Sequence, residues 1–146
     1  LDRTTIYATD INPNSLKLAE QGIFHIDRIK EYTANYQKSG GRESFSTYFT
    51  ADYHSAMLDK TLRANIVFAD HSLATDSVFS EVQFVSCRNV LIYFDRDLQN
   101  RALGLFNDSL ARRGFLALGS KETLRFSNYN LNFEVFSREE KIYRRI

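Results

Sequence analysis

The sequence predicts an α/β domain with a mostly parallel sheet and an antiparallel end. Three observations favour this class. Strand-like runs alternate with helix-like segments, residues typical of helix starts and ends follow the first run, and the chain finishes on a hairpin-like stretch. The 146 residues, 43% hydrophobic and 25% charged, are enough for one domain with a real core. We therefore expect residues 1–146 to form one globular domain.

Charge and cysteine content restrict the possible partners and the compartment. The 19 basic and 18 acidic residues give a net charge of +1, which lacks the basic excess typical of nucleic-acid or membrane-surface binding. Cys87 is the only cysteine, so no internal disulfide can form, and we expect a reducing, cytoplasmic environment. No apolar run approaches the roughly 20 residues of a membrane span, and no His or Cys spacing predicts a metal site.

The first βα unit is the clearest local pattern. "TTIYATD", residues 4–10, is short and rich in β-formers, which predicts a buried strand. Asn12 is placed to cap the next helix, Pro13 occupies its first position, and Gly22 is suited to ending it.

The following segments predict a helix and then a small β excursion. Residues 27–41 place Ile29, Tyr32 and Tyr36 on one helical face and end in two glycines. From Ser44 to Leu62 the aromatic, Thr and Ser residues lose the helical period, so we expect short antiparallel strands or a hairpin.

The second half predicts two central strands, a long helix, a core strand and a closing hairpin. "ANIVFADHSL" (residues 64–73) and "VQFVSCRN" (residues 82–89) are the strands, and "FLALG" (residues 115–119) is the later core segment. We expect the helix to run over residues 95–114, with Gly114 as its stop and an apolar stripe of Leu98, Ala102, Leu105, Phe106 and Leu110. Residues 133–137 and 141–145 predict the hairpin.

Polar residues follow three of the predicted strands. Asp10 is placed to accept hydrogen bonds from ribose hydroxyls, although a solvated or capping Asp is the plainer interpretation of this residue alone. Ser72 follows the second strand within "ADHSL", where Leu73 could cover a planar ring. The carboxyl ends of parallel strands are where open α/β sheets bind ligands, so the three ends together favour a ligand crevice.

The stretch "CRNVLIYF", residues 87–94, carries the most chemistry. Arg88 and Asn89 offer several hydrogen-bond donors in a fixed geometry, and Tyr93 adds a phenol. A surface salt bridge is the plainer interpretation of Arg88. Cys87 has no base near it in the sequence, which favours a buried filler over a nucleophile.

Four strings resemble one family, the CheR-type chemotaxis receptor methyltransferases. They are "IYATDINPNSLKLAEQGIF", "LRANIVFADHSL", "VSCRNVLIYFDRDLQNRAL" and "RRGFLALGSKETL", and they occur in the family's order. The resemblance implies a Rossmann-like class I methyltransferase sheet, the cofactor S-adenosylmethionine (product S-adenosylhomocysteine), and methyl transfer to glutamate side chains of chemoreceptors. It also implies a small β-subdomain near residues 42–62, at the position where some members of the family hold the C-terminal tail of a receptor.

The resemblance assigns roles to the polar residues. Asp10 would hold the cofactor ribose, Ser72 and Leu73 would lie by the adenine, and Arg88 and Asn89 would line the cofactor and substrate crevice. Tyr93 would stand near the transferred methyl, so Arg88 and Tyr93 are the expected catalytic residues. Ser72 stands where the family usually has Asn, so a shorter side chain is available at this position for a hydrogen bond to the adenine.

The family's first motif, a central strand with a glycine-rich loop, is absent from this sequence. We therefore expect the C-terminal part of a methyltransferase domain whose sheet is incomplete at its N-terminus and which is inactive alone. The missing N-terminal half, or a second copy, would complete the sheet. The rival hypothesis is a non-catalytic signalling module that docks on a receptor or kinase partner.

Overall fold

The computed structural model describes residues 3–146. They divide into two units, with the boundary between His71 and Ser72. Strand pairing follows the same division, because within the described residues no sheet contains strands from both units. The expectation of a single domain over residues 1–146 stays a prediction.

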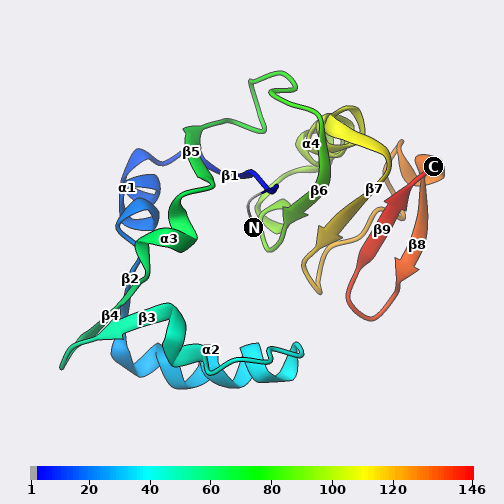
Figure 1. Cartoon of the computed structure of the whole chain (residues 1–146). Coiled ribbons are helices and arrows are strands. Elements are labelled where there is room, and N and C mark those ends of the chain that lie inside the picture. The colour runs from blue at the N-terminus through cyan, green and yellow to red at the C-terminus, as the bar shows by residue number, and fades with distance from the viewer. Residues whose placement is uncertain (1–2) are drawn as a thin grey trace. The chain divides into compact units, whose positions relative to one another are not determined.

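The first unit contains a parallel pair of strands with a helix against it (Figure 1). Strands β1 (Ile6–Asp10) and β5 (Ile66–Asp70) pair in register from Ile6 opposite Ile66 to Asp10 opposite Asp70. Helix α1 (Pro13–Gln21) packs on both strands. The predicted first βα unit is therefore present.

Both ends of α1 are fixed by the residues that the sequence singled out. The side chain of Asn12 accepts a hydrogen bond from the backbone N–H of Asn14 at 2.9 Å, and Pro13 is the first helical residue. Gly22 has a φ of 63°, and its N–H donates to the carbonyls of Leu18 and Ala19. A left-handed glycine is the usual helix stop, so this prediction is confirmed.

The β excursion is a three-stranded antiparallel sheet in the order β2-β4-β3. Strands β3 (Phe49–Ala51) and β4 (Ser55–Leu58) form the expected hairpin, and β2 (Ile23–His25), which the sequence did not predict, pairs with β4. Helix α2 (Ile26–Lys38), the 3-10 turn η1 (Phe45–Tyr48) and the short helix α3 (Lys60–Arg63) complete this part. Its packing is aromatic, with the rings of Tyr36 and Tyr48 5.6 Å apart and their hydroxyls 3.2 Å apart.

The second unit is a mixed four-stranded sheet in the order β6-β7-β9-β8 (Figure 1). Strands β6 (Val82–Cys87) and β7 (Leu110–Leu118) are parallel, and the hairpin of β8 (Phe133–Ser137) and β9 (Ile142–Arg145) pairs antiparallel with β7 through β9. The turns η2 (Leu91–Tyr93) and η3 (Asn130–Asn132) lie in its loops. Together the sheets confirm an α/β fold with parallel strands and an antiparallel C-terminal hairpin.

Helix α4 (Arg96–Ser109) is shorter than the sequence predicted. The helix does not run to Gly114, because Leu110 is already extended (φ −76°, ψ 132°) and begins β7 opposite Val82. A Cβ on Gly114 would lie 2.8 Å from the carbonyl oxygen of Ala111 and 3.1 Å from that of Gln83. Gly114 therefore permits a close backbone approach inside the strand, next to an irregularity in β6–β7 pairing, and is not a helix stop.

The core of the second unit lies among α4, β7 and their neighbours. Leu110, Leu116, Leu118 and Leu124 are the largest fully buried side chains. Of the predicted stripe on α4, Ala102 and Phe106 are buried, whereas Leu98 and Leu105 are half-buried. This core supports the carboxyl ends of β6 and β7, where the candidate site begins.

Candidate functional site

The loop that follows β6 presents polar side chains on an apolar base. Arg88, Asn89 and Tyr93 are exposed, and 81% of Tyr93 is accessible to solvent. Leu91 is buried between them, and Val90 packs against the same core. The alternation of apolar and polar residues therefore anchors the loop while its polar groups face outward.

A second loop meets this one because β6 and β7 are parallel and end side by side. Cys87 pairs with Leu118 at the last position of the two strands. A turn follows β7, in which the N–H of Glu122 donates to the carbonyl of Gly119 at 2.9 Å. The side chain of Glu122 is 4% exposed and accepts hydrogen bonds from the backbone of the residue 88–94 loop.

Glu122 is the residue of this site that sequence reasoning missed. It lies within the string "RRGFLALGSKETL", but its spacing from Arg88 carries no local signal. The available signal was a lone acidic residue in a short loop after a core strand, a position at the same sheet edge as Arg88.

Helix α4 holds the far end of the Arg88 loop. The side-chain amide of Gln99 donates to the carbonyls of Leu91 and Phe94, both at 3.0 Å. Asp95 caps the helix by accepting from the N–H of Leu98 at 2.9 Å. Residues 88–94 are therefore fixed by hydrogen bonds at both ends.

Cys87 has the chemistry of a core residue. It is 7% exposed, and burial, with a smaller contribution from the Glu122 carboxylate, raises the pKa of its thiol to about 12. The thiol therefore stays protonated at neutral pH and cannot serve as a nucleophile. This agrees with the interpretation of Cys87 as a filler.

Ser72 and Leu73 open the second unit. Ser72 is 9% exposed, and its hydroxyl oxygen accepts from the N–H groups of Ala74 and Thr75, each at 3.3 Å. Its own N–H donates to Asp76 at 2.8 Å. Leu73 packs against the core of this unit. The serine thus stabilises a tight turn, and its hydroxyl donates no hydrogen bond within residues 3–146.

Asp10 belongs to the first unit. It ends β1 next to Asp70, its partner at the end of β5. One oxygen of the exposed Asp10 carboxylate accepts from the N–H of Asn12 at 2.8 Å, and its carbonyl accepts from the N–H of His71. Asp10 therefore shapes the turn into α1, as the plainer interpretation expected, while its second carboxylate oxygen carries no hydrogen bond within residues 3–146.

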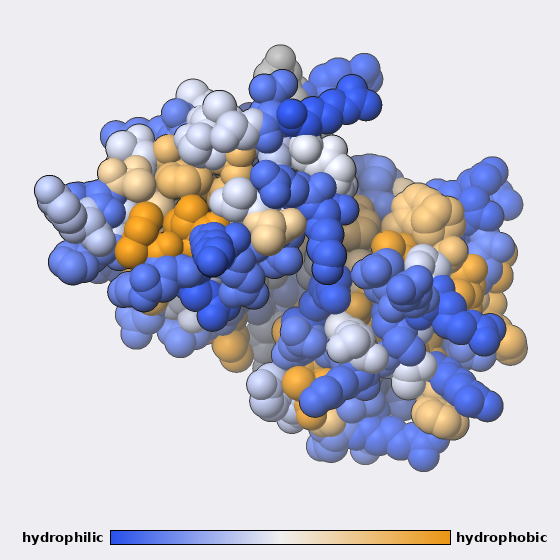
Figure 2. Space-filling model, turned by 90° about the horizontal axis from the view of Figure 1, so that it is seen from below, coloured by the Kyte–Doolittle hydropathy of each residue, from blue (hydrophilic) through white to orange (hydrophobic). Residues whose placement is uncertain are grey.

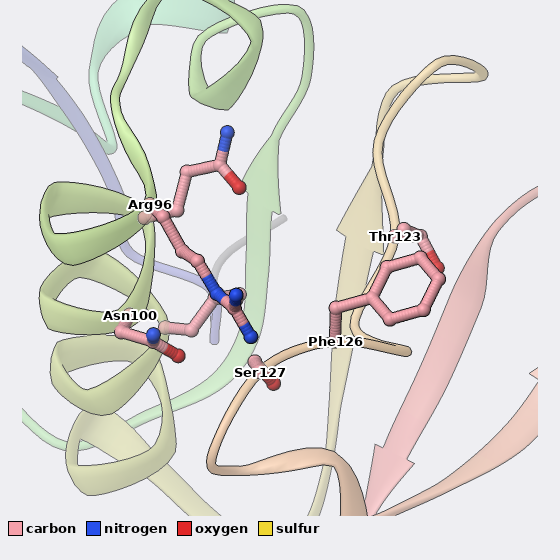
Figure 3. Close-up of a pocket in the computed structure, with 7 residues that line it drawn as sticks. Arg96, Asn100, Thr123, Phe126 and Ser127 are labelled. Carbon is pink, nitrogen blue, oxygen red and sulfur yellow. The ribbon is translucent and has the colours of Figure 1, made fainter.

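A pocket of about 390 Å³ lies in the second unit, between α4 and the segment after β7. Arg96 and Asn100 project from the helix, and the Arg96 side chain extends toward Ser127 (Figure 3). The other lining residues are Gln99, Leu103, Thr123 and Phe126. The pocket thus combines one guanidinium with amides, hydroxyls and an aromatic ring.

Two features are absent from residues 3–146. No group of three or more His, Cys, Asp and Glu side chains there is arranged to hold a metal ion. No helix in that range has both the length and the apolar character needed to cross a membrane.

Of the six predicted site residues, Arg88, Asn89 and Tyr93 lie on one loop, and Ser72 and Leu73 belong to the same unit as that loop. Asp10 is in the other unit.

Comparisons with known proteins give the same family that the four sequence strings resemble. Residues 2–142 match the family described as CheR methyltransferase, SAM binding domain. Cher3 of Pseudomonas putida, a protein named as a methyltransferase, is 59% identical over 145 residues, which are 99% of this chain and 53% of that protein. The chemotaxis protein methyltransferase of Listeria innocua is 34% identical over 120 residues, covering 82% of this chain and 42% of the relative. Chemotaxis protein methyltransferase 2 of Pseudomonas aeruginosa is 29% identical over 119 residues, covering 80% and 41%.

This chain therefore spans about half the length, or less, of these curated relatives.

Proposed function

The chain belongs to the CheR methyltransferase family, whose matched domain binds S-adenosylmethionine, and from this premise we propose that it serves in methyl transfer from that cofactor to glutamate side chains of chemoreceptors. The observation that carries the proposal is the loop "CRNVLIYF", which stands at the carboxyl edge of a parallel strand pair with its polar residues exposed. Relatives named as chemotaxis protein methyltransferases support the receptor as substrate.

The residue types in this loop suit such a reaction. A glutamate side chain has a reference pKa of about 4.3, so it is ionised at neutral pH and needs no general base before it attacks a sulfonium methyl. The enzyme must instead orient the carboxylate in line with the methyl–sulfur bond and exclude water. We assign the orientation to Arg88 and Tyr93, and we assign Asn89 to the cofactor. Arg88 forms no ion pair within residues 3–146, which leaves its charge for a ligand.

The cofactor contacts are proposed for each unit by itself. In the first unit, the second oxygen of Asp10 is placed at a strand end and can accept a ribose hydroxyl. In the second unit, Ser72 has a hydroxyl proton to donate, and Leu73 supplies an apolar side chain for the adenine. The bonds that Asp10 and Ser72 already make are compatible with these roles, because each leaves one polar atom or proton unused.

An additional strand is part of this proposal. Parallel strands are ordinarily buried on both faces, whereas Ile6 of β1 and Val67 of β5 are 44% and 45% exposed. In the second unit β6 is an edge strand, and its Phe84 is 55% exposed. Figure 2 shows apolar groups on the molecular surface among hydrophilic ones. We propose that an upstream part of the whole protein, or a second copy, covers these strands.

Calorimetric titration with S-adenosylhomocysteine tests the proposal. We expect the chain to bind this product more tightly once the upstream part of the whole protein is joined to it, and we expect the joined protein to transfer labelled methyl groups to receptor peptides. No binding in either form would refute the cofactor assignment. Binding without methyl transfer would instead favour a non-catalytic docking module.

A further inference from the structure

Glu122 is a buried carboxylate without a basic partner. It is 4% exposed, and no Lys, Arg or His within residues 3–146 forms an ion pair with it. We propose that Glu122 is a positioning residue, whose carboxylate holds the loop of residues 88–94 in the shape that presents Arg88, Asn89 and Tyr93 to the cofactor and substrate. The ligand part of this inference rests on the proposed function, while the loop geometry does not.

Four backbone N–H groups donate to the two oxygens of this side chain. One oxygen accepts from Val90 at 2.9 Å and from Leu91 at 2.8 Å. The other accepts from Asn89 at 3.1 Å and from Gly119. Three of the donors are consecutive, so the loop forms a concave group of N–H donors of the kind that binds anions, and Glu122 is its anion.

The backbone of residues 89–91 is shaped around the Glu122 carboxylate, which acts as a clamp on this loop. Asn89 has a φ of 60°, in the left-handed region that asparagine adopts more readily than most other non-glycine residues. Val90 follows in a right-handed conformation (φ −113°, ψ −49°), which turns its N–H and that of Leu91 toward the same carboxylate. Without the carboxylate, these N–H groups would lose their charged partner, and the left-handed to right-handed turn at Asn89 and Val90 would lose the hydrogen bonds that hold it.

The turn after β7 is fitted to the same purpose. A Cβ on Gly119 would lie 2.5 Å from the side-chain oxygen of Asn89 and 2.8 Å from its backbone nitrogen, and 2.7 Å from Glu122. Only glycine at this position leaves room for the Arg88 loop and the carboxylate together. Glu122 is also placed by its own backbone, because its N–H closes the turn onto Gly119.

The clamp acts on the loop and not on the bulk of the core. The fully buried Leu110 lies at the opposite end of β7, where it pairs with Val82. Cys87 pairs with Leu118 at the end that carries the loop. A change at Leu110 should therefore lower stability while leaving the loop intact, and a change at Glu122 should alter the loop directly.

The test compares Glu122→Gln with Leu110→Ala. Glutamine has the size of glutamate, but its NH₂ cannot accept a hydrogen bond, so two of the four donors lose their acceptor. In Glu122→Gln we expect the amide protons of residues 89–91 and 119 to shift upfield in NMR spectra and to exchange about tenfold faster or more, because hydrogen bonds to a charged group are lost. Glu122→Asp keeps the charge and should bring the chemical shifts and the exchange rates of these amide protons part of the way back to the wild-type values. Glu139→Gln, an exposed change in the β8–β9 turn, should leave these amides unchanged.

Titration with S-adenosylhomocysteine then separates positioning from stability. We expect Glu122→Gln to lose about tenfold in affinity, and Leu110→Ala, studied where it is fully folded, to keep the wild-type value. An equal loss of S-adenosylhomocysteine affinity in both variants would overturn the inference. So would unchanged chemical shifts and exchange rates of the loop amides in Glu122→Gln. The titrations use the joined protein if the chain alone binds no S-adenosylhomocysteine. If neither form of the wild type binds it, the proposed function fails, and the amide signals alone decide whether Glu122 holds the loop.

Discussion

Cys87 provides a quantitative test of the site that needs neither cofactor nor substrate. Burial, and next the Glu122 carboxylate, raise the pKa of the thiol from 9.0 to about 12. A shift of about three units lowers the fraction of thiolate roughly 1000-fold at any pH well below 9. Since the thiolate is the reactive form, alkylation of the folded protein should be about 1000-fold slower than alkylation of the unfolded chain.

The assay is iodoacetamide labelling at about pH 8 followed by intact-mass measurement, in buffer and in concentrated urea. Cys87 is the only cysteine, so every adduct reports on it. A synthetic peptide covering residues 85–91 gives the rate of the unperturbed thiol. A folded-state rate within about tenfold of the peptide would refute the buried, inert thiol and would reopen its role as a nucleophile.

The same pKa shift predicts how stability depends on pH. The folded pKa lies above the unfolded one, so the stabilisation by the protonated thiol is fully present below about pH 9. It is lost as the pH rises toward 12, because the unfolded chain releases its proton first. Three units correspond to about 4 kcal/mol of unfolding free energy over this range. Urea titrations of wild type and Cys87→Ala across this range would measure the difference.

Three other substitutions test the site and its support. Asp10→Ala should weaken S-adenosylhomocysteine binding by about 1–3 kcal/mol in a calorimetric titration; Asp10→Asn keeps an acceptor for the Asn12 N–H and separates loop from ligand effects, and unchanged affinity would remove Asp10 from the ribose site. Arg88→Ala should lower methyl transfer to receptor peptides far more than it lowers the melting temperature, and a parallel fall of both would make Arg88 structural. Leu118→Ala, at a fully buried position, should cost about 3–5 kcal/mol in urea unfolding, and a cost below about 1 kcal/mol would contradict its place in the core.

Local signals explain why much of the fold was predictable. Asn12, Pro13 and Gly22 act within one or two turns of their own chain, so their effect on α1 can be read from the sequence directly. The closing hairpin was equally clear, because both of its strands keep β-forming residues and lie close in the chain. The strand ends were predicted from the points where runs of β-forming residues give way to polar ones, and the polar loop after β6 was identified in this way.

The end of α4 was predicted wrongly because a helical pattern and a strand pattern overlap in the residues after Ser109. Leu110 continues the apolar stripe of the helix, and Gly114 resembles a stop signal. Pairing of Leu110 with Val82 decides the outcome, and that partner lies far away in the chain. Tertiary pairing therefore overrode local propensity here, and the glycine served a close backbone contact.

The role of Glu122 was missed for the same physical reason, and its position bears on how Arg88 can act. Its partners at residues 89–91 are more than 30 positions away in the chain, and they are backbone groups that any residue carries. Both of its oxygens accept from backbone N–H donors, and within residues 3–146 Glu122 forms no ion pair with the Arg88 guanidinium. Because the expected methyl acceptor is itself a carboxylate, a loop held by a satisfied internal anion keeps its one cation available for the substrate. An Arg88–Glu122 ion pair in place of these backbone hydrogen bonds would instead consume that charge.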